Sequence, residues 1–219
     1  MKTVAVIPIK TNNERLPGKN TKLLAGKPLI SYCLEQLEQV KEIDEVYVYC
    51  SDERIKEYLP ASVIFLKRPE QLDLPTSNFN QIFDQFIEQV NAERYVYAHA
   101  TAPFVTAQTI VECIKATDSD KYDSAFTAIE IQDYLWNDKG PLNFDAQNVP
   151  RSQDLDKIYR ESSGVYVIMR EVYKAIGRRV GEQPYIKPIS YKEAIDINTP
   201  EDFKLAEIFV NVDFSREVN

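Results

Sequence analysis

The sequence predicts an α/β fold in which helices cover both faces of a mostly parallel sheet. Strand-like apolar runs alternate with amphipathic helical segments across the first 130 residues, a pattern typical of strands joined by crossover helices. The first run, VAVIPI at 4–9, is continuously apolar and rich in β-branched residues, as in a strand buried on both faces. The length of 219 residues suits one domain, so we assign 1–219 to a single domain.

Hydrophobic periodicity places the elements in order. Helix 29–40, for example, has Ile30, Cys33, Leu34 and Leu37 at helical spacing. Thr199 is the expected N-cap of the last helix. Strands are predicted over 4–9, 45–51, 63–66, 94–100, 124–131, 164–169 and 194–197. Helices are predicted over 29–40, 53–58, 80–90, 109–116 and 200–210.

The stretch from 133 to 155 interrupts this alternation. It contains Trp136, Gly140, Pro141 and Pro150 and shows little periodicity. We expect it to leave the sheet as an excursion.

Overall charge and composition exclude several classes of function. The net charge of −8 disfavours a nucleic-acid binder or a protein of anionic membranes, since both require a basic excess. No apolar run reaches transmembrane length and no export signal is recognised. The three cysteines are widely spaced within apolar patterns, as expected of core residues in a reducing compartment. We therefore expect a cytoplasmic protein.

Positive charge is concentrated locally, between positions 10 and 27. In this stretch a single acidic residue, Glu14, accompanies five basic ones. The five are Lys10, Arg15, Lys19, Lys22 and Lys27. This local potential predicts a site for a phosphorylated small molecule.

The loop over 10–20 follows the first strand, at the sheet edge where open α/β folds bind ligands. Gly18 permits close backbone approach, and Arg15 and Lys19 supply charge for a triphosphate. The loop matches neither a Walker motif nor a dinucleotide fingerprint. A solvated polar turn is an equally balanced interpretation.

A second candidate site is Asp196 with Asn198, at the end of the strand expected over 194–197. Alternation would place both side chains on one face, where their oxygens could hold Mg²⁺. The alternative is that both residues shape the turn before the last helix.

Four further residues are candidates for substrate contact. Arg160 could bind a carboxylate, or form an ordinary surface salt bridge. His99, the only histidine, could face the substrate or be a satisfied residue at the edge of the core. Arg68 and Ser77 could contact a base or ribose, or belong to a loop that caps a helix.

Taken in chain order, these segments resemble the acylneuraminate (CMP-sialic acid) cytidylyltransferases, a family whose relatives act on other acidic nonulosonic and octulosonic sugars. The resemblance rests on short motifs that span most of the chain. They are IPIK at 7–10, ERLPGKN at 14–20, LAGKPLI at 24–30, RP at 68–69, HATAP at 99–103, YRE at 159–161, IDINT at 195–199 and EDF at 201–203.

The resemblance implies a three-layer α/β/α Rossmann-like nucleotidyltransferase fold, with CTP and Mg²⁺ as reactants. It also implies a homodimer, with 133–163 as an excursion that crosses to the partner subunit. The family's metal carboxylate corresponds to Asp196, and its phosphate-binding lysine and asparagine correspond to Lys19 and Asn20.

Several positions depart from the family pattern. Lys10 replaces an arginine, Glu14 a lysine and His99 a glutamine. Asn13 stands where a glycine-rich stretch is usual, and Ser162 and Ser163 replace Asn-Gly. Asn198 replaces an aspartate and removes one negative charge from the predicted metal site.

The predicted activity is transfer of CMP from CTP to a hydroxyl of an acidic sugar, with release of pyrophosphate, for cell-surface glycan biosynthesis. Catalytic roles fall to Lys19, Arg15 and Asp196, and metal binding to Asp196 and Asn198. Nucleotide contacts fall to Lys10, Asn20, Arg68 and Ser77, and sugar contacts to His99 and Arg160. Two alternatives remain: a nucleotidyltransferase with another triphosphate or a sugar or polyol phosphate acceptor, and a catalytically silent nucleotide-sugar binder.

Overall fold

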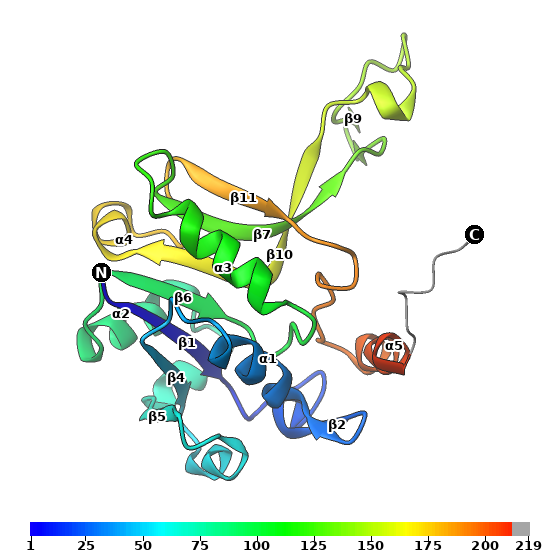
Figure 1. Cartoon of the computed structure of the whole chain (residues 1–219). Coiled ribbons are helices and arrows are strands. Elements are labelled where there is room, and N and C mark those ends of the chain that lie inside the picture. Colours follow the sequence, from blue (N-terminus) through cyan, green and yellow to red (C-terminus); the bar gives the residue numbers. More distant parts are fainter. Residues whose placement is uncertain (212–219) are drawn as a thin grey trace.

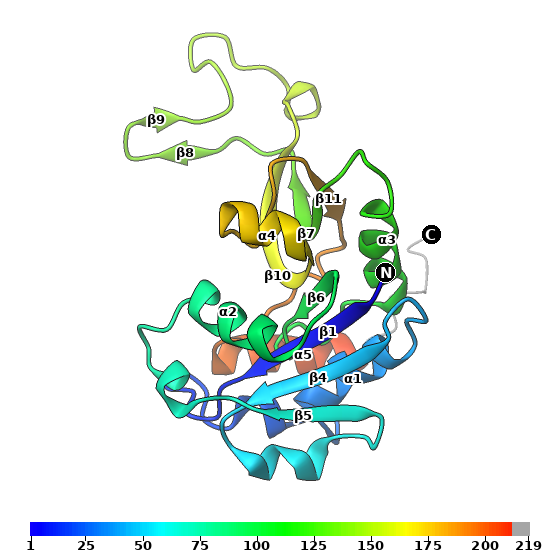
Figure 2. The ribbon, with the colours of Figure 1, turned by 90° about the vertical axis from the view of Figure 1, so that its left-hand side faces the viewer.

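The central sheet has seven strands in the order β11-β7-β10-β6-β1-β4-β5, in a computed structural model that describes residues 1–211. Helices cover both faces, which gives three layers (Figures 1 and 2). The predicted fold class is confirmed. Residues 212–219 of the domain predicted over 1–219 lie outside the described part.

The elements have the following bounds. The sheet strands are β1 (Thr3–Ile9), β4 (Glu45–Cys50), β5 (Val63–Lys67), β6 (Arg94–Ala98), β7 (Ser124–Ile131), β10 (Ile158–Met169) and β11 (Pro184–Pro188). The α-helices are α1 (Leu29–Glu38), α2 (Phe79–Gln89), α3 (Ala107–Ala116), α4 (Arg170–Ile176) and α5 (Pro200–Asn211). Two small ladders pair β2 (Leu23–Leu24) with β3 (Lys27–Pro28) and β8 (Trp136–Asn137) with β9 (Gly140–Pro141). The 3₁₀ helices are η1 (Lys19–Thr21), η2 (Glu53–Tyr58), η3 (Glu70–Asp73) and η4 (Ser152–Asp154).

Side-chain alternation along β1 builds the two halves of the core. Ala5, Ile7 and Ile9 pack with α1 and α3 on one face, and Val4 and Val6 pack with α2 and α4 on the other. Because successive side chains of a strand point to opposite faces, a continuously apolar strand suits a sheet covered on both sides.

Strand β10 runs antiparallel between β6 and β7, whereas the other pairings in the sheet are parallel. It begins six residues before the predicted start at 164, since Ile158 already pairs with Ile131. The register shifts between Glu161 and Tyr166, and this irregularity hides the strand from a periodicity argument.

The strand predicted over 194–197 is wrong. Residues 191–194 form a turn, and residues 195–198 belong to no strand. Ile197 instead donates its backbone N–H to Thr101 O at 2.8 Å. The edge strand β11 and helix α4 were not predicted from the sequence.

The segment between β7 and β10 projects from the body as an arm that carries the β8–β9 ladder (Figures 1 and 2). Trp136, Leu142 and Val149 are exposed on it. Residues 158–161, the first part of β10, pair with β7, so they join the arm to the sheet. None of the helices within residues 1–211 has the length and apolar character needed to cross a bilayer.

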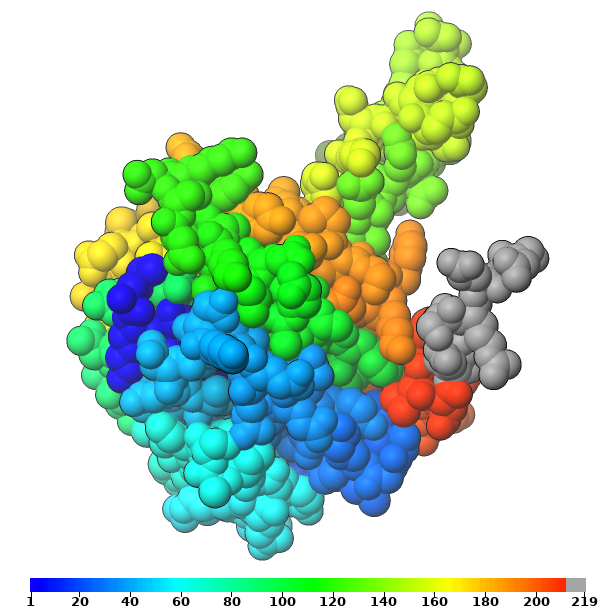
Figure 3. Space-filling view, in the orientation of Figure 1, coloured from blue at the N-terminus to red at the C-terminus, as the bar shows by residue number. Residues whose placement is uncertain are grey.

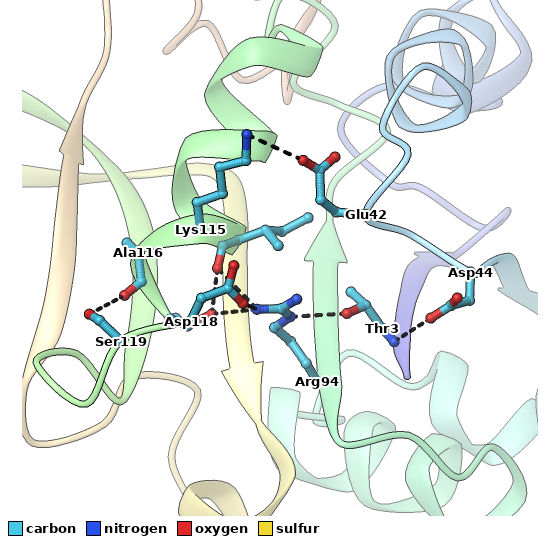
Figure 4. Close-up of polar contacts among 10 residues, drawn as sticks. Thr3, Glu42, Asp44, Arg94, Lys115, Ala116, Asp118 and Ser119 are labelled. Atoms are coloured by element: carbon cyan, nitrogen blue, oxygen red, sulfur yellow. Dashed lines mark hydrogen bonds and ion pairs between the residues drawn. The ribbon is translucent and has the colours of Figure 1, made fainter. Parts of the chain in front are cut away.

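A polar cluster around Arg94 joins the amino ends of strands β1 and β6 (Figure 4). The buried Arg94 donates to Thr3 Oγ1 at 3.0 Å, to Ile114 O at 3.0 Å and to Asp118 Oδ1 at 2.6 Å. Thr3 N in turn donates to Asp44 Oδ2 at 2.7 Å. A buried guanidinium needs such partners, so these contacts explain Arg94 as a structural residue that joins β6, β1 and the end of α3.

Candidate active site

Three parallel strands, β1, β4 and β6, direct their carboxyl ends to one edge of the sheet. Lys10 follows β1, Ser51 follows β4, and His99 follows β6. Open α/β sheets bind ligands at this edge. The polar residues that leave these strands therefore form the natural starting point for the site.

The loop after β1 is held in a defined shape. Gly18 has φ +65°, a left-handed conformation that favours glycine, and it directly precedes η1. Asn20 is 6% exposed and donates from Nδ2 to Lys10 O at 3.0 Å. Asn20 thus stabilises the loop through a hydrogen bond between two of its own residues.

Helix α5 brings the C-terminal segment to this loop. Leu16 and Leu24 from the β1–α1 connection share an apolar cluster with Ile197, Phe203 and Ala206. Figure 3 shows the C-terminal helix, in red, against this early part of the chain, in blue. Burial of these apolar side chains therefore holds together two segments far apart in sequence.

Lys19, Asn198 and Asp196 form one hydrogen-bonded network. Lys19 Nζ donates to Asn198 Oδ1 at 3.0 Å and to Ile197 O at 3.0 Å. Arg15 also donates to Asn198 Oδ1, at 3.2 Å. Asn198 Nδ2 donates to Asp196 Oδ2 at 2.7 Å. The amide of Asn198 thus joins the cations of the loop to the carboxylate of Asp196.

The start of α5 fixes this network from the C-terminal side. Asp202 Oδ2 accepts from the backbone N–H groups of Asn198 and Thr199, at 2.9 and 2.8 Å. Thr199 Oγ1 accepts from Asp202 N at 3.2 Å, which confirms the predicted N-cap. Burial alone would raise the pKa of Asp202, but these backbone donors hold it below its usual value.

The donor set fits a divalent cation. Asp196 Oδ1 is buried and has no hydrogen-bond partner among residues 1–211, which is costly for a carboxylate oxygen unless a ligand completes it. No cluster of three or more His, Cys, Asp or Glu side chains of metal-site geometry occurs in the described part. Mg²⁺ often takes one or two protein carboxylates and completes its shell with water and substrate phosphates, so a single carboxylate such as Asp196 fits it.

Electrostatics link Lys19, Asp196 and His99. Burial lowers the pKa of Lys19, while the charge of Asp196 acts in the opposite direction. Burial also lowers the pKa of His99, again opposed by Asp196, so the imidazole is neutral near pH 7. His99 Nδ1 is buried without a partner among the described residues.

A cavity of about 300 Å³ lies over the network and is lined by Lys10, Arg15, Lys19 and Asn198, among others. Two neighbouring hollows share Thr11 and Asp52 with each other. Asp52 follows the carboxyl end of β4. This place directly after a strand is the signal in the sequence that points to Asp52.

The five clustered cations do not act together. Lys27 Nζ pairs with Glu35 at 2.6 Å and lies 4.0 Å from the centre of the Tyr32 ring. Lys22 Nζ lies 5.1 Å from the centre of the Phe203 ring. Neither lysine lines the cavity over the network, because clustering in sequence does not fix the direction of side chains.

Arg68 and Ser77 lie outside these three hollows. Arg68 is 2% exposed and its guanidinium pairs with Asp73, which also accepts from Ser51. Ser77 donates to Gln71 O at 3.3 Å, and Asn78 rather than Ser77 caps α2. In this structure Arg68 pairs with Asp73, a residue that lines one of the hollows.

Arg160 is exposed and is not brought to His99. In β10, Arg160 pairs with Ile129 and Glu161 with Ala128, so the two side chains leave opposite faces. Ala128 and Tyr97 belong to the same apolar cluster, which places Glu161 on the face of His99 and Arg160 on the other. The predicted role of Arg160 in sugar binding gains no support from this placement.

Two other residues near the site were not predicted from the sequence. Arg179 pairs with Glu161 on the His99 face. Glu193 binds the start of α3, with Oε1 accepting from Thr109 Oγ1 at 2.7 Å. Both follow segments in which no element was predicted correctly, so no strand end or helix start drew attention to them.

Comparison with known proteins extends this description. A sequence model of the family described as Cytidylyltransferase matches residues 4–215. The CMP-N,N'-diacetyllegionaminic acid synthase of Legionella pneumophila is 30% identical, with 94% of this chain and 95% of that protein covered. The N-acylneuraminate cytidylyltransferase of Oncorhynchus mykiss is 26% identical over 93% of this chain, which spans 49% of that longer protein.

The fold also resembles a solved structure. The CMP:2-keto-3-deoxy-manno-octonic acid synthetase complexed with CTP superposes with a TM-score of 0.70 at 18% identity, with 96% of this chain and 98% of that one covered. This similarity supports the arrangement of strands and helices described above.

Proposed function

Because this chain belongs to the cytidylyltransferase family, we propose that it transfers CMP from CTP to a hydroxyl of an acidic sugar and releases pyrophosphate. The observation that carries the proposal is the network in which Asn198 joins Lys19 to Asp196 at the carboxyl edge of the sheet. Both relatives named above carry an acidic sugar in their names, which supports an acidic acceptor and a role in supplying activated sugars for cell-surface glycans.

The loop side of the network would hold the triphosphate. Lys19 and Arg15 converge within hydrogen-bond distance of one oxygen, that of Asn198, so phosphate oxygens at this position would meet both charges. Lys10 lines the same cavity, and Asn20 keeps the loop in shape. Fixed cations in a partly buried site stabilise the charge that develops during phosphoryl transfer without reorganisation.

Asp196 would hold Mg²⁺ through its unpartnered Oδ1. Asn198, whose Oδ1 now accepts from Lys19 and Arg15, would join it as a ligand once phosphate oxygens take over those two cations. When bound, the ion neutralises phosphate charge and orients the triphosphate. The protein contributes position: a hydroxyl oxygen of the sugar forms a bond to the α-phosphorus, the α–β bridging bond breaks, and pyrophosphate leaves. The hydroxyl proton passes to solvent in this scheme.

The nucleoside would lie in the hollows beside Asp52. Arg68 and Asp73 brace the wall next to Ser51. We assign Arg68 and Ser77 to nucleoside recognition as part of this proposal. Because both side chains are held by protein partners in this structure, direct contact with CTP would require those partners to be exchanged.

In this proposal the protein is a cytoplasmic homodimer that binds neither nucleic acid nor membranes. The arm within 133–163 supports dimer formation, because its exposed Trp136, Leu142 and Val149 would gain from burial against a second subunit. The acidic net charge of −8 supports the absence of a polyanion partner.

The proposal is tested with the wild-type protein, Mg²⁺, each of the four ribonucleoside triphosphates and a panel of acidic sugars. Pyrophosphate release and product mass are read together. We expect turnover with CTP and a product with the mass of a CMP-sugar. Turnover with UTP, or with a sugar or polyol phosphate, would favour the other nucleotidyltransferase activities.

A silent binder is the second outcome to be separated. The neutral Asn198 beside Asp196 lowers the negative charge of the metal site, and this observation favours weak or absent catalysis. CTP binding in a calorimeter, with no pyrophosphate release for any acceptor, would establish it.

A further inference from the structure

Arg179 is a cation near His99, the residue that the sequence predicts as a sugar contact, and the triphosphate scheme has no use for it. It lies between α4 and β11, in the segment after Gly177. Its side chain is 43% exposed, so its guanidinium is available to a ligand at little cost in desolvation. The segment is anchored nearby, since Gly177 O accepts from Asn80 Nδ2 at 2.7 Å.

Protein contacts orient the guanidinium without saturating it. Arg179 Nη2 donates to Glu161 Oε1, and its Cζ lies 4.7 Å from the centre of the Tyr166 ring. Tyr166 also donates to Glu161. The other two guanidinium nitrogens, Nε and Nη1, donate to no residue in the part of the chain that the structure describes.

The Tyr166 ring lies next to both Arg179 and His99. The rings of His99 and Tyr166 lie 6.0 Å apart at their centres. His99 follows the carboxyl end of β6, and the charge of Asp196 opposes the lowering of the His99 pKa by burial. Arg179 thus lies one side chain beyond His99.

The other cations near the site either line the triphosphate cavity, as Lys10 does, or are otherwise engaged. Lys19 and Arg15 contact Asn198, Arg68 is buried with Asp73, and Arg160 leaves the opposite face of β10. A carboxylate on the acceptor needs a cationic partner near His99. A carboxylate accepts best from two adjacent N–H groups on one edge of a guanidinium, and such an edge pairs Nη2 with Nε or with Nη1. Nη2 has a second N–H beside the one that contacts Glu161, so Arg179 can offer one paired edge.

We propose that Arg179 binds the carboxylate of the acceptor sugar and determines the selectivity of the enzyme for acids over neutral sugars. This inference rests on the proposed function. In it, the Tyr166 ring holds the guanidinium toward His99, and Glu161 is a protein partner whose carboxylate is not required for acceptor binding.

The test compares an N-acylneuraminic acid, the acid in the name of the trout relative, with its carboxamide. In the wild type we expect the acid to be preferred. For Arg179→Gln we expect KM for the acid to rise about 10- to 100-fold, as for loss of a charge-assisted hydrogen bond. KM for CTP and KM for the carboxamide should stay near their wild-type values. Arg179→Lys should recover part of the preference, because it keeps the charge but not the paired donors.

Two further variants separate substrate binding from a structural role. Arg178→Gln removes the neighbouring arginine, which pairs with Glu182 at 2.5 Å, and should leave both acceptors unaffected. Glu161→Gln removes the protein partner of Arg179 and should keep the preference for the acid. If Glu161→Gln loses the preference as Arg179→Gln does, the pair is structural and the inference is overturned. An unchanged KM for the acid in Arg179→Gln overturns it as well.

Failure of the proposed function gives a different result. In that case the wild type forms no CMP-sugar from any acid. Binding of the acid alone, followed by saturation-transfer NMR, then decides the inference. Binding to the wild type and its loss in Arg179→Gln support the inference, and equal binding to both, or binding to neither, contradicts it.

Discussion

Lys19 Nζ donates a 3.0 Å hydrogen bond to Asn198 Oδ1, a residue 179 positions further along the chain. The contact places the loop after β1 against the segment before α5. It therefore brings the proposed triphosphate cations next to the proposed metal carboxylate.

Replacement of Lys19 by alanine should lower kcat/KM about 10²- to 10³-fold, the usual effect of removing one fixed donor to developing charge. Lys19 contacts Asn198 and Ile197, and Arg15, the other cation on Asn198 Oδ1, should preserve the remaining activity. Steady-state kinetics with CTP measures the effect. Lys22→Ala is the matched control, because Lys22 contacts the Phe203 ring instead, and it should stay within about twofold of wild type, as for an exposed substitution away from the site. Equal losses in both variants would contradict the assignment.

Replacement of Asn198 by aspartate should strengthen metal binding. It adds a second carboxylate beside Asp196 Oδ2, where the amide now donates at 2.7 Å, and divalent cations bind more tightly as ligand charge rises. Mn²⁺ titration followed by electron paramagnetic resonance measures this without turnover. Asp196→Asn is the opposite control and should bind Mn²⁺ more weakly than wild type. Tighter binding in Asp196→Asn than in Asn198→Asp would show that the metal lies elsewhere.

Glu193 should act as a positioning residue. Its Oε1 accepts from Thr109 Oγ1 at 2.7 Å and from Thr106 Oγ1 at 3.2 Å, which ties the start of α3 to the segment that carries Asp196. Glu193→Ala should lower the free energy of unfolding by about 1 kcal/mol and reduce kcat more than KM for CTP. Urea denaturation and kinetics measure both, and Glu193→Gln, which keeps an acceptor oxygen, should recover most of each. If kcat stays at the wild-type value in Glu193→Ala, the tie has no role in placing Asp196.

Buried thiols should make stability fall at alkaline pH. Burial raises the pKa of Cys33 to about 12 and that of Cys113 to about 12, whereas an exposed thiol in the unfolded chain ionises near about 8.5. The folded chain then binds more protons than the unfolded chain, so the free energy of unfolding falls as pH rises above about 8.5. Each thiol should contribute a slope of about 1.4 kcal/mol per pH unit once the unfolded thiol is ionised.

Urea denaturation between pH 8 and pH 10 measures this slope. Cys113→Ala should change the free energy of unfolding at every pH. It should also reduce the slope of that free energy with pH by about 1.4 kcal/mol per pH unit, the contribution of one thiol. An identical slope in wild type and Cys113→Ala would show that Cys113 ionises equally in both states.

The sequence was sufficient for the parts of the fold that follow simple periodicity. The apolar runs of β1, β4 and β6 and the helical face of α1 correspond closely to the structure. The start of β10 was missed because Tyr159 and Arg160 are polar and exposed, and β11 because prolines mark both of its ends. The expected strand over 194–197 failed because Ile197 bonds to a loop carbonyl and not to a strand.

The candidate site was predictable where a motif follows an apolar, strand-like run. The loop that carries Lys19 follows β1, whereas Asp196 was identified through an expected strand over 194–197 that does not form. The structure still brings the two residues together. The directions of Lys22 and Lys27 depend on packing against α5 and α1, which local sequence does not encode. Arg179 became visible only through its contact with Glu161 across the fold.

The central claim, that Lys19 and Asp196 hold one triphosphate, is tested most directly by a double-mutant cycle on CTP binding. Calorimetry in the presence of Mg²⁺ would give the CTP affinity of wild type, Lys19→Ala, Asp196→Asn and the double variant. A shared site predicts that each single change weakens CTP binding and that the double variant loses less than the sum of the two, because both act through one ligand. Wild-type CTP affinity in either single variant, or strictly additive losses, would contradict it.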